Sequence, residues 1–186
     1  MVIFLAGAHG VGKTFLGKPA AESLGFEYAT ASSLIRDELG GQQNWERDKR
    51  TSDVDGNQEA LVTAVSKIIE GDDAVLVLDG HFVLRNESGM LISLPCNIFK
   101  RLGLSSVILI ESPTSVVSGR LEKRGVPQPI EDISELAEAE LSSAEHVCQE
   151  IGIPLTRLVS LSKERLLSEL RGAVSLSTPE KSGTER

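Results

Sequence analysis

The sequence has only two cysteines, and neither belongs to a recognisable metal or disulfide pattern. Cys96 and Cys148 lie far apart in the chain, with no CxxC pair and no histidine at the usual metal-ligand spacing. A disulfide framework and a structural zinc site are therefore not suggested. Two isolated thiols fit a reducing compartment, so we expect a cytoplasmic protein.

Long hydrophobic runs and an excess of basic residues are also missing. The N-terminal apolar run, VIFLA, is too short to span a bilayer and follows no charged segment, so neither a signal peptide nor a membrane anchor is expected. The net charge is -8, from 19 basic and 27 acidic residues. General nucleic-acid binding requires a clustered excess of cations that neutralises phosphates, so this function class is disfavoured.

The 186 residues instead contain an alternation of short apolar runs and helical patterns. Runs at 2–6, 74–79 and 106–111 predict strands covered on both faces of a parallel sheet, and weaker candidates lie at 26–29 and 154–159. This order predicts an α/β fold, doubly wound, in one domain over residues 1–174. A disordered tail is expected at 175–186, because its last ten residues, STPEKSGTER, include no large apolar residue.

Helical spacing of apolar residues predicts helices between these strands, one around 61–69 and a longer one over 130–151. On the longer helix, the expected buried face consists of Ile130, Ile133, Ala137, Leu141, Ala144, Val147 and Ile151.

The segment GAHGVGKT matches the P-loop pattern GxxxxGK(S/T) directly after the first predicted strand. Its glycines let successive backbone N–H groups point at a phosphate, and the next helix adds its dipole. Lys13 is expected to reach the β- and γ-phosphates of ATP, with the Thr14 hydroxyl as a ligand of Mg²⁺. The alternative is a glycine-rich turn that matches by accident. The expected nucleotide-binding residues are Gly7, Ala8, His9, Gly10, Val11, Gly12, Lys13 and Thr14.

Asp79 ends the most hydrophobic predicted strand, AVLVLD. A carboxylate at the carboxyl edge of a parallel strand beside a P-loop is placed to hold Mg²⁺, so Asp79 is the second predicted metal residue. The alternative is an aspartate that merely ends a strand before Gly80. Gly80 and His81 follow where many P-loop hydrolases carry a glutamate that polarises water, which favours transfer to an acceptor over hydrolysis.

In these motifs the sequence resembles the P-loop nucleoside and nucleotide kinases, and archaeal-type adenylate kinases most. The resemblance covers roughly residues 1–160 and implies a three-layer fold with five parallel strands in the order 2-3-1-4-5. It also implies ATP with Mg²⁺, an acceptor-binding segment at about 28–70 and a short lid at about 119–135.

Arg36 and Gln58 are the candidates for acceptor binding within that segment. Arg36 resembles the family arginine that contacts an acceptor phosphate, although it could instead pair with Asp37 or Glu38 on the helix surface. Gln58 shares a helical face with apolar residues, so its amide could contact a base edge or serve only as a buried or capping group.

His81 and two arginines complete the predicted site. Asp79, one residue and then His81 resemble the archaeal-type motif, so His81 is expected to contact the acceptor or order the site; a purely structural role is the alternative. Ser112 and Pro113 form a good N-cap and N1 pair, so a helix is expected to start there. On it, Arg120 and Arg124 resemble lid arginines that neutralise the moving phosphoryl group, or they could form a solvated helix end.

The sequence therefore predicts a Mg²⁺-dependent ATP phosphotransferase with a nucleotide or nucleoside acceptor, acting as a monomer or small homo-oligomer. Lys13, Arg120 and Arg124 are its expected catalytic residues. Two alternatives stay open: a kinase for another small metabolite, and a non-catalytic ATP-binding switch or ATPase that acts through a protein partner.

Overall fold

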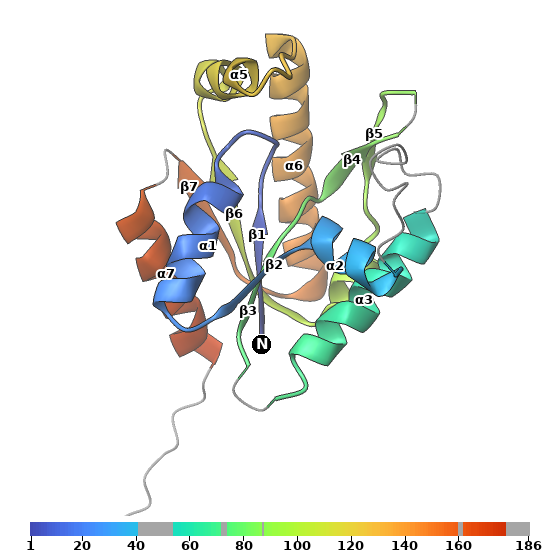
Figure 1. Ribbon diagram of the computed structural model, residues 1–186, viewed down its shortest axis with the longest axis vertical. Helices are drawn as coiled ribbons and strands as arrows, with labels where there is room; N and C mark the ends of the chain where they lie inside the picture. The colour runs from blue at the N-terminus through green and yellow to red at the C-terminus, as the bar shows by residue number, and fades with distance from the viewer. Residues whose placement is uncertain (41–53, 72–73, 87, 160–161, 178–186) are drawn as a thin grey trace, which may run out of the picture.

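A computed structural model describes residues 1–40, 54–71, 74–86, 88–159 and 162–177 of the chain. Its centre is a five-stranded sheet in the order β2-β3-β1-β6-β7, in which every neighbouring pair is parallel (Figure 1). When the separate hairpin is set aside, this is the predicted order 2-3-1-4-5, so the predicted fold class is confirmed. The sheet strands are β1 (Val2–Ala6), β2 (Glu27–Thr30), β3 (Leu76–Asp79), β6 (Leu104–Glu111) and β7 (Leu155–Val159), and the hairpin consists of β4 (Val83–Arg85) and β5 (Leu91–Ser93).

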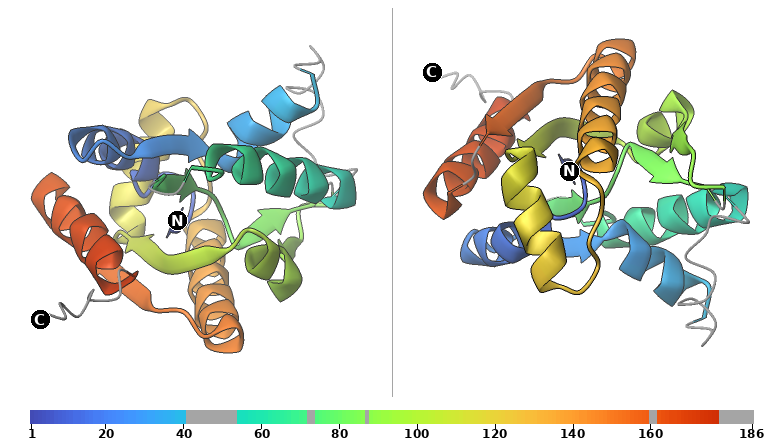
Figure 2. Two further views of the ribbon diagram at one scale, coloured as in Figure 1. Left: turned by 90° about the horizontal axis from the view of Figure 1, so that it is seen from below. Right: turned by 90° about the horizontal axis from the view of Figure 1, so that it is seen from above.

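Helices cover both faces of the sheet (Figure 2). One face carries α1 and α7 side by side, and the other carries α3, α4 and α6. Because both faces are covered, every residue of β1 and β3 is buried, which explains why these strands are almost continuously apolar. The helices are α1 (Lys13–Ser23), α2 (Ala31–Glu38), α3 (Val54–Ile68), α4 (Cys96–Arg101), α5 (Thr114–Lys123), α6 (Ile130–Ile151) and α7 (Lys163–Ser177).

Two predicted boundaries are wrong. α5 begins at Thr114, and its N-cap is Pro113 with an extended ψ of 138°. Ser112 does not cap the helix, and its hydroxyl instead donates to the carbonyl of Val11 (3.4 Å) in the loop between β1 and α1. α7 continues through Ser177, so residues 175–177 of the expected tail are helical, and the remainder of that tail lies outside the described residues.

The buried face of α6 also differs from the prediction. Leu136 and Glu140 are buried, whereas Ala137 is exposed and Ile130 is 55% exposed. Ile133, Ala144 and Val147 are buried as predicted, so the predicted face is correct in part. Glu140 is a buried carboxylate on this face, and a count of apolar residues passes over it because its side chain is charged.

An aromatic cluster supports the loop that follows β3. The rings of Phe4 and Phe82 lie 5.0 Å apart between centroids, and Phe99 lies 4.7 Å from Phe82. Gly80 passes so close to this cluster that a Cβ there would lie 2.6 Å from Cε2 of Phe4. The absence of a side chain at Gly80 therefore lets the loop bring His81 over the core.

Candidate active site

The P-loop connects β1 to α1 at the carboxyl edge of the sheet. Gly7, Gly10 and Gly12 all have positive φ, at 138°, 87° and 105°, a region that other residues rarely adopt. A Cβ at Gly7 would also collide with the carbonyl oxygen of Ile110 on β6. The predicted glycines therefore stand where the backbone requires them, and α1 begins directly afterwards at Lys13.

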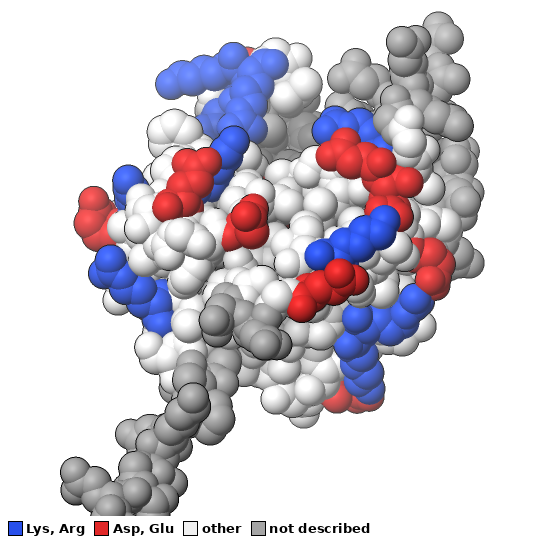
Figure 3. All heavy atoms as spheres, turned by 60° about the horizontal axis from the view of Figure 1, so that its bottom comes forward, with Lys and Arg blue, Asp and Glu red and all other residues white. Residues whose placement is uncertain are grey.

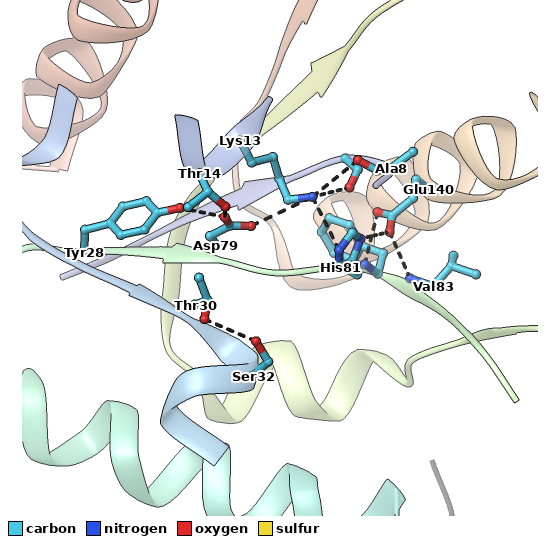
Figure 4. A network of polar contacts seen from close by, with 12 residues as sticks. Ala8, Lys13, Thr14, Tyr28, Thr30, Ser32, Asp79, His81, Val83 and Glu140 are labelled. Atoms are coloured by element: carbon cyan, nitrogen blue, oxygen red, sulfur yellow. Dashed lines mark hydrogen bonds and ion pairs between the residues drawn. The ribbon is translucent and has the colours of Figure 1, made fainter. Parts of the chain in front are cut away.

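Lys13 folds back over the P-loop and is only 7% exposed. Its Nζ donates to the carbonyl of Gly7 (2.6 Å) and lies 3.8 Å from Oδ1 of Asp79 (Figure 4). Burial lowers the pKa of Lys13, and the carboxylates of Asp79 and Glu140 act against that shift. The ammonium group is thus held at the edge where the P-loop turns into the helix.

Asp79 joins three elements through one carboxylate oxygen. Its Oδ2 accepts hydrogen bonds from the Thr14 hydroxyl (2.8 Å) and from the Tyr28 hydroxyl (2.6 Å). Sequence reasoning paired Thr14 with Asp79 and the structure brings them together, but it missed Tyr28. The available signal was strand pairing: Tyr28 lies in β2, which pairs with β3, and it stands beside Val77, two residues before Asp79. Burial, then the charge of Asp79, raises the pKa of Tyr28, so this hydroxyl keeps its proton.

His81 lies between the P-loop lysine and a buried glutamate (Figure 4). Its Nε2 is 3.4 Å from Nζ of Lys13, and its Nδ1 is 2.9 Å from Oε1 of Glu140. The ring also packs against the ring of His9, with 4.1 Å between the centroids. Burial, and next the positive charge of Lys13, lowers the pKa of His81, so the ring is neutral at pH 7.

Glu140 is the second residue of this site that sequence reasoning missed. It is 1% exposed and accepts hydrogen bonds from the backbone N–H groups of Phe82 (3.1 Å) and Val83 (3.5 Å). Burial raises its pKa to about 7, against the opposing effect of those hydrogen bonds. Its position, four residues from both Leu136 and Ala144 on the buried face of α6, was the available signal.

Of the two predicted lid arginines, Arg120 contacts the P-loop. Its Nη1 donates to the carbonyls of Gly10 (3.1 Å) and Val11 (2.7 Å). Arg124 is exposed at the C-cap of α5, where its backbone N–H donates to Leu121 (3.1 Å). The connection from α5 to α6 spans only residues 124–129, so two helices contribute most of the predicted lid segment at 119–135.

The two predicted acceptor residues lie on α2 and α3, away from these contacts. Arg36 is half exposed, and its Nε lies 3.4 Å from Oδ1 of Asp37, which is one of the pairings that the sequence left open. Gln58 is buried on α3, as its helical phase predicted. Among the described residues, no hydrogen bond or ion pair joins either side chain to the P-loop, and residues 41–53 of the expected acceptor segment lie outside the described part.

The face drawn in Figure 3 carries charges of both signs. Basic side chains gather at its upper left, and elsewhere on this face acidic and basic side chains lie next to one another. In the part of the chain that the structure describes, no group of three or more His, Cys, Asp or Glu side chains is arranged to hold a metal ion. No described helix is long and apolar enough to cross a membrane.

The model of the AAA domain family matches residues 6–137, a span that contains the P-loop, Asp79, His81 and Arg120. The chain belongs to this family. Glu140 lies three residues beyond the matched span.

Several proteins similar to this chain are named as kinases. A putative adenylate kinase of Pyrococcus abyssi is 25% identical over 191 residues, which cover 100% of this chain and 87% of the relative. A shikimate kinase of Marinomonas sp. is 32% identical over 88 residues, 46% of this chain and 47% of the relative. The solved shikimate kinase from Acinetobacter baumannii shares the fold, with a TM-score of 0.58 at 17% identity over 96% of this chain and 95% of that one. The predicted resemblance to adenylate kinase-like P-loop kinases is thus confirmed.

Proposed function

We propose that the protein is a Mg²⁺-dependent phosphotransferase that moves the γ-phosphate of ATP to a nucleotide or nucleoside. The observation that carries this proposal is the convergence of Lys13, Thr14 and Asp79 within hydrogen-bonding or ion-pair distance at the end of the P-loop. Phosphoryl transfer needs mainly positioning and positive charge around the phosphates, and this edge of the sheet supplies both. The adenylate kinase relative, which is matched along the whole chain, supports the choice of acceptor.

Thr14 and Asp79 are the residues that would hold Mg²⁺. A hydroxyl and a carboxylate oxygen 2.8 Å apart are hard oxygen ligands, and Mg²⁺ usually takes only one or two carboxylates together with phosphate oxygens and water. The pair therefore fits the ion without a cage of several carboxylates. When bound, Mg²⁺ supplies neutralisation of the phosphate charge.

Lys13 and Arg120 are proposed to act on the donor. Both cations already donate to P-loop carbonyls, Lys13 to Gly7 and Arg120 to Gly10 and Val11, so each would exchange a carbonyl for a phosphate oxygen. Arg124, one helical turn beyond Arg120, is proposed to add positive charge from the exposed end of α5.

Arg36, Gln58 and His81 are proposed to contact the acceptor. Arg36 would have to leave Asp37 in order to bind a phosphate, which costs little for a pair as exposed as this one. We further propose that the enzyme is cytoplasmic, which its free thiols at Cys96 and Cys148 support, and that it acts as a monomer or small homo-oligomer.

A kinase for a hydroxyl-bearing metabolite is the second candidate. Nε2 of the neutral His81 ring lies 3.4 Å from Nζ of Lys13, and once Lys13 turns to a phosphate this nitrogen could accept a hydrogen bond from a hydroxyl but not from an ionised phosphate. The match to a shikimate kinase over 88 residues favours the same acceptor class.

The test is ADP production from Mg-ATP by the purified protein, alone and with pooled nucleoside monophosphates, nucleosides, or sugars and hydroxy acids. We expect ADP only when one pool is present, and loss of that signal in Lys13→Ala. A signal confined to sugars and hydroxy acids would favour the second candidate. Full activity of Lys13→Ala, or turnover that no acceptor stimulates, would contradict the phosphotransferase proposal and favour an ATPase or a switch that acts through a protein partner.

A further inference from the structure

Glu140 is a buried acid on which the loop after β3 converges, and the proposed transfer of phosphate gives it no role so far. Three hydrogen-bond contacts meet at its carboxylate: the N–H of Phe82 (3.1 Å), the N–H of Val83 (3.5 Å) and Nδ1 of His81 (2.9 Å). A 1% exposed carboxylate on a helix that otherwise buries apolar side chains is costly unless it is hydrogen-bonded, so these contacts compensate its burial.

The neighbours of His81 decide which ring nitrogen carries the proton. The Lys13 ammonium has hydrogens to donate and no lone pair, and its Nζ lies 3.4 Å from Nε2 of His81. The backbone of Gly7 is a further hydrogen-bond partner of the ring, so the assignment rests on the two side-chain contacts. Nε2 faces the ammonium group, and Nδ1 faces the carboxylate of Glu140 at 2.9 Å, which assigns the lone pair of the neutral ring to Nε2 and its hydrogen to Nδ1. That hydrogen points at Oε1 of Glu140, which also accepts from the N–H of Val83, while Oε2 accepts from the N–H of Phe82.

We propose that Glu140 is a positioning residue for phosphoryl transfer, which holds His81 as the Nδ1–H tautomer with its Nε2 lone pair facing Lys13. The other tautomer would point an N–H group at the ammonium group and push it away from the carbonyl of Gly7, to which Lys13 donates at 2.6 Å. The ring of His9 packs on His81 from the P-loop, so His81 is fixed by contact on one side and by Glu140 on the other.

The kinetic consequence rests on the proposed function, whereas the tautomer can be observed without any activity. The ¹⁵N spectrum of the histidine rings separates a nitrogen that carries hydrogen from one that does not. We would record it at pH 8 for the wild-type protein, with assignment from His9→Gln and His146→Gln variants. We expect His81 to be neutral with its hydrogen on Nδ1. A hydrogen on Nε2 would overturn the proposal.

Glu140→Gln is the main variant, because it keeps the shape of the side chain. The glutamine amide has only one oxygen for the three hydrogens that Glu140 accepts, so its NH₂ group must face either the backbone or His81. We expect the His81 hydrogen to move to Nε2 in a substantial fraction of molecules. Glu138→Gln is the matched control, because Glu138 lies two residues away on α6 and is exposed.

The same variants are then tested as kinases, with the acceptor that gave a signal in the pooled assay. We expect Glu140→Gln to lower kcat about 10- to 100-fold, as the loss of a histidine-orienting partner does elsewhere, with little change in KM for ATP. Glu138→Gln should leave both constants and the spectrum unchanged. An unchanged kcat in a folded Glu140→Gln protein would overturn the positioning role, even if its melting temperature fell.

Failure of the proposed function gives a different pattern. If the wild-type protein shows the expected tautomer but no acceptor stimulates ADP release, the assignment of the enzyme is wrong while the link from Glu140 to His81 stands. If Glu140→Gln does not fold, the wild-type spectrum still decides the tautomer.

Discussion

The polar side chains around the P-loop differ from those on α2 and α3 in how they are held. Around the P-loop, Lys13, Asp79 and Glu140 are less than 10% exposed, and each has two or more polar partners. On α2 and α3, Arg36 and Lys67 are about half exposed or more, and each pairs with one carboxylate.

This difference teaches where the protein is rigid and where it can adapt. A buried polar group with several partners has one favourable position. Leaving it without a hydrogen bond costs more free energy than a hydrogen bond contributes to stability. An exposed ion pair can break and form again at little cost in free energy. The donor side of the site is thus organised in advance, while Arg36 on the proposed acceptor side can rearrange around its ligand. Gln58 and His81, which are largely buried, are expected to stay in place.

The largest expected effect comes from Asp79→Asn on the donor side. The variant keeps the shape of the side chain, but its NH₂ group cannot accept from Thr14 or Tyr28, and it removes the charge proposed for Mg²⁺. We expect kcat to fall about 100- to 1,000-fold, measured as ADP release over a titration with Mg²⁺. Glu150→Gln makes the same change of charge at an exposed carboxyl and should leave kcat unchanged. Equal activity of Asp79→Asn and wild type would remove Asp79 from the metal site.

The pH dependence of stability should differ between wild type and Glu140→Gln. Burial raises the pKa of Glu140 from 4.5 to about 7, so between these values the folded protein keeps a proton that the unfolded chain releases. The stabilising contribution of Glu140 is therefore complete below pH 4.5, decreases as the pH rises to about 7 and is constant above it. Over this pH range the contribution of Glu140 to the free energy of unfolding falls by about 3 kcal/mol, and the Glu140→Gln protein should show no such fall.

The measurement is urea unfolding of both proteins from pH 4.5 to pH 8. His9, His81 and Lys13 are present in both proteins, so the difference also includes the part of their contribution that comes from the charge of Glu140, which raises the pKa of His9 and of Lys13. We expect wild type to lose stability relative to the variant as the pH rises. A difference that stays constant over this range would mean that the pKa of Glu140 is not raised.

Gly80→Ala should destabilise the loop that carries His81. A Cβ there would lie 2.6 and 2.8 Å from two ring atoms of Phe4, which is itself packed in the aromatic cluster. We expect a loss of about 1 to 3 kcal/mol in the free energy of unfolding. Gly119→Ala on α5 is the matched control, because nothing lies within 4 Å of a Cβ there, and it should stabilise the protein by about 0.4 to 1 kcal/mol. Equal changes in the free energy of unfolding for the two variants would show that the Phe4 ring can move aside at no cost.

The same contrast explains what the sequence could predict. The P-loop and Asp79 are local patterns, because their function requires particular residue types at fixed spacing after strands, and the structure has Thr14 and Asp79 in contact. The order of the five strands followed from the family resemblance. The hairpin and α4 were not predicted, since strands of three residues and a helix of six are too short to show a period.

Residues that act through distant contacts were the ones missed. Glu140 reaches His81 across 59 positions of the chain and Tyr28 reaches Asp79 across 51, so neither pairing leaves a local pattern. Glu140 was also missed because the buried face of a helix is chosen from its apolar residues. One buried charged residue on that face makes the face appear to lie in a different direction. Arg36 and Arg124 have exposed side chains, and few contacts determine their conformations. The sequence therefore could not predict what they contact.

The smallest expected effect belongs to the ion pair between α2 and α3. Nζ of Lys67 lies 2.7 Å from Oε1 and 2.8 Å from Oε2 of Glu38, yet the lysine side chain is 61% exposed. Water screens such a pair and ordering the lysine costs entropy, so Lys67→Ala should change the free energy of unfolding by less than about 1 kcal/mol. Urea unfolding at low salt and in 0.5 M NaCl checks this, and salt should shrink the difference between the two proteins further. A loss above about 2 kcal/mol that salt does not reduce would show that α2 and α3 are held as firmly as the donor side, and the contrast between the two regions would fail.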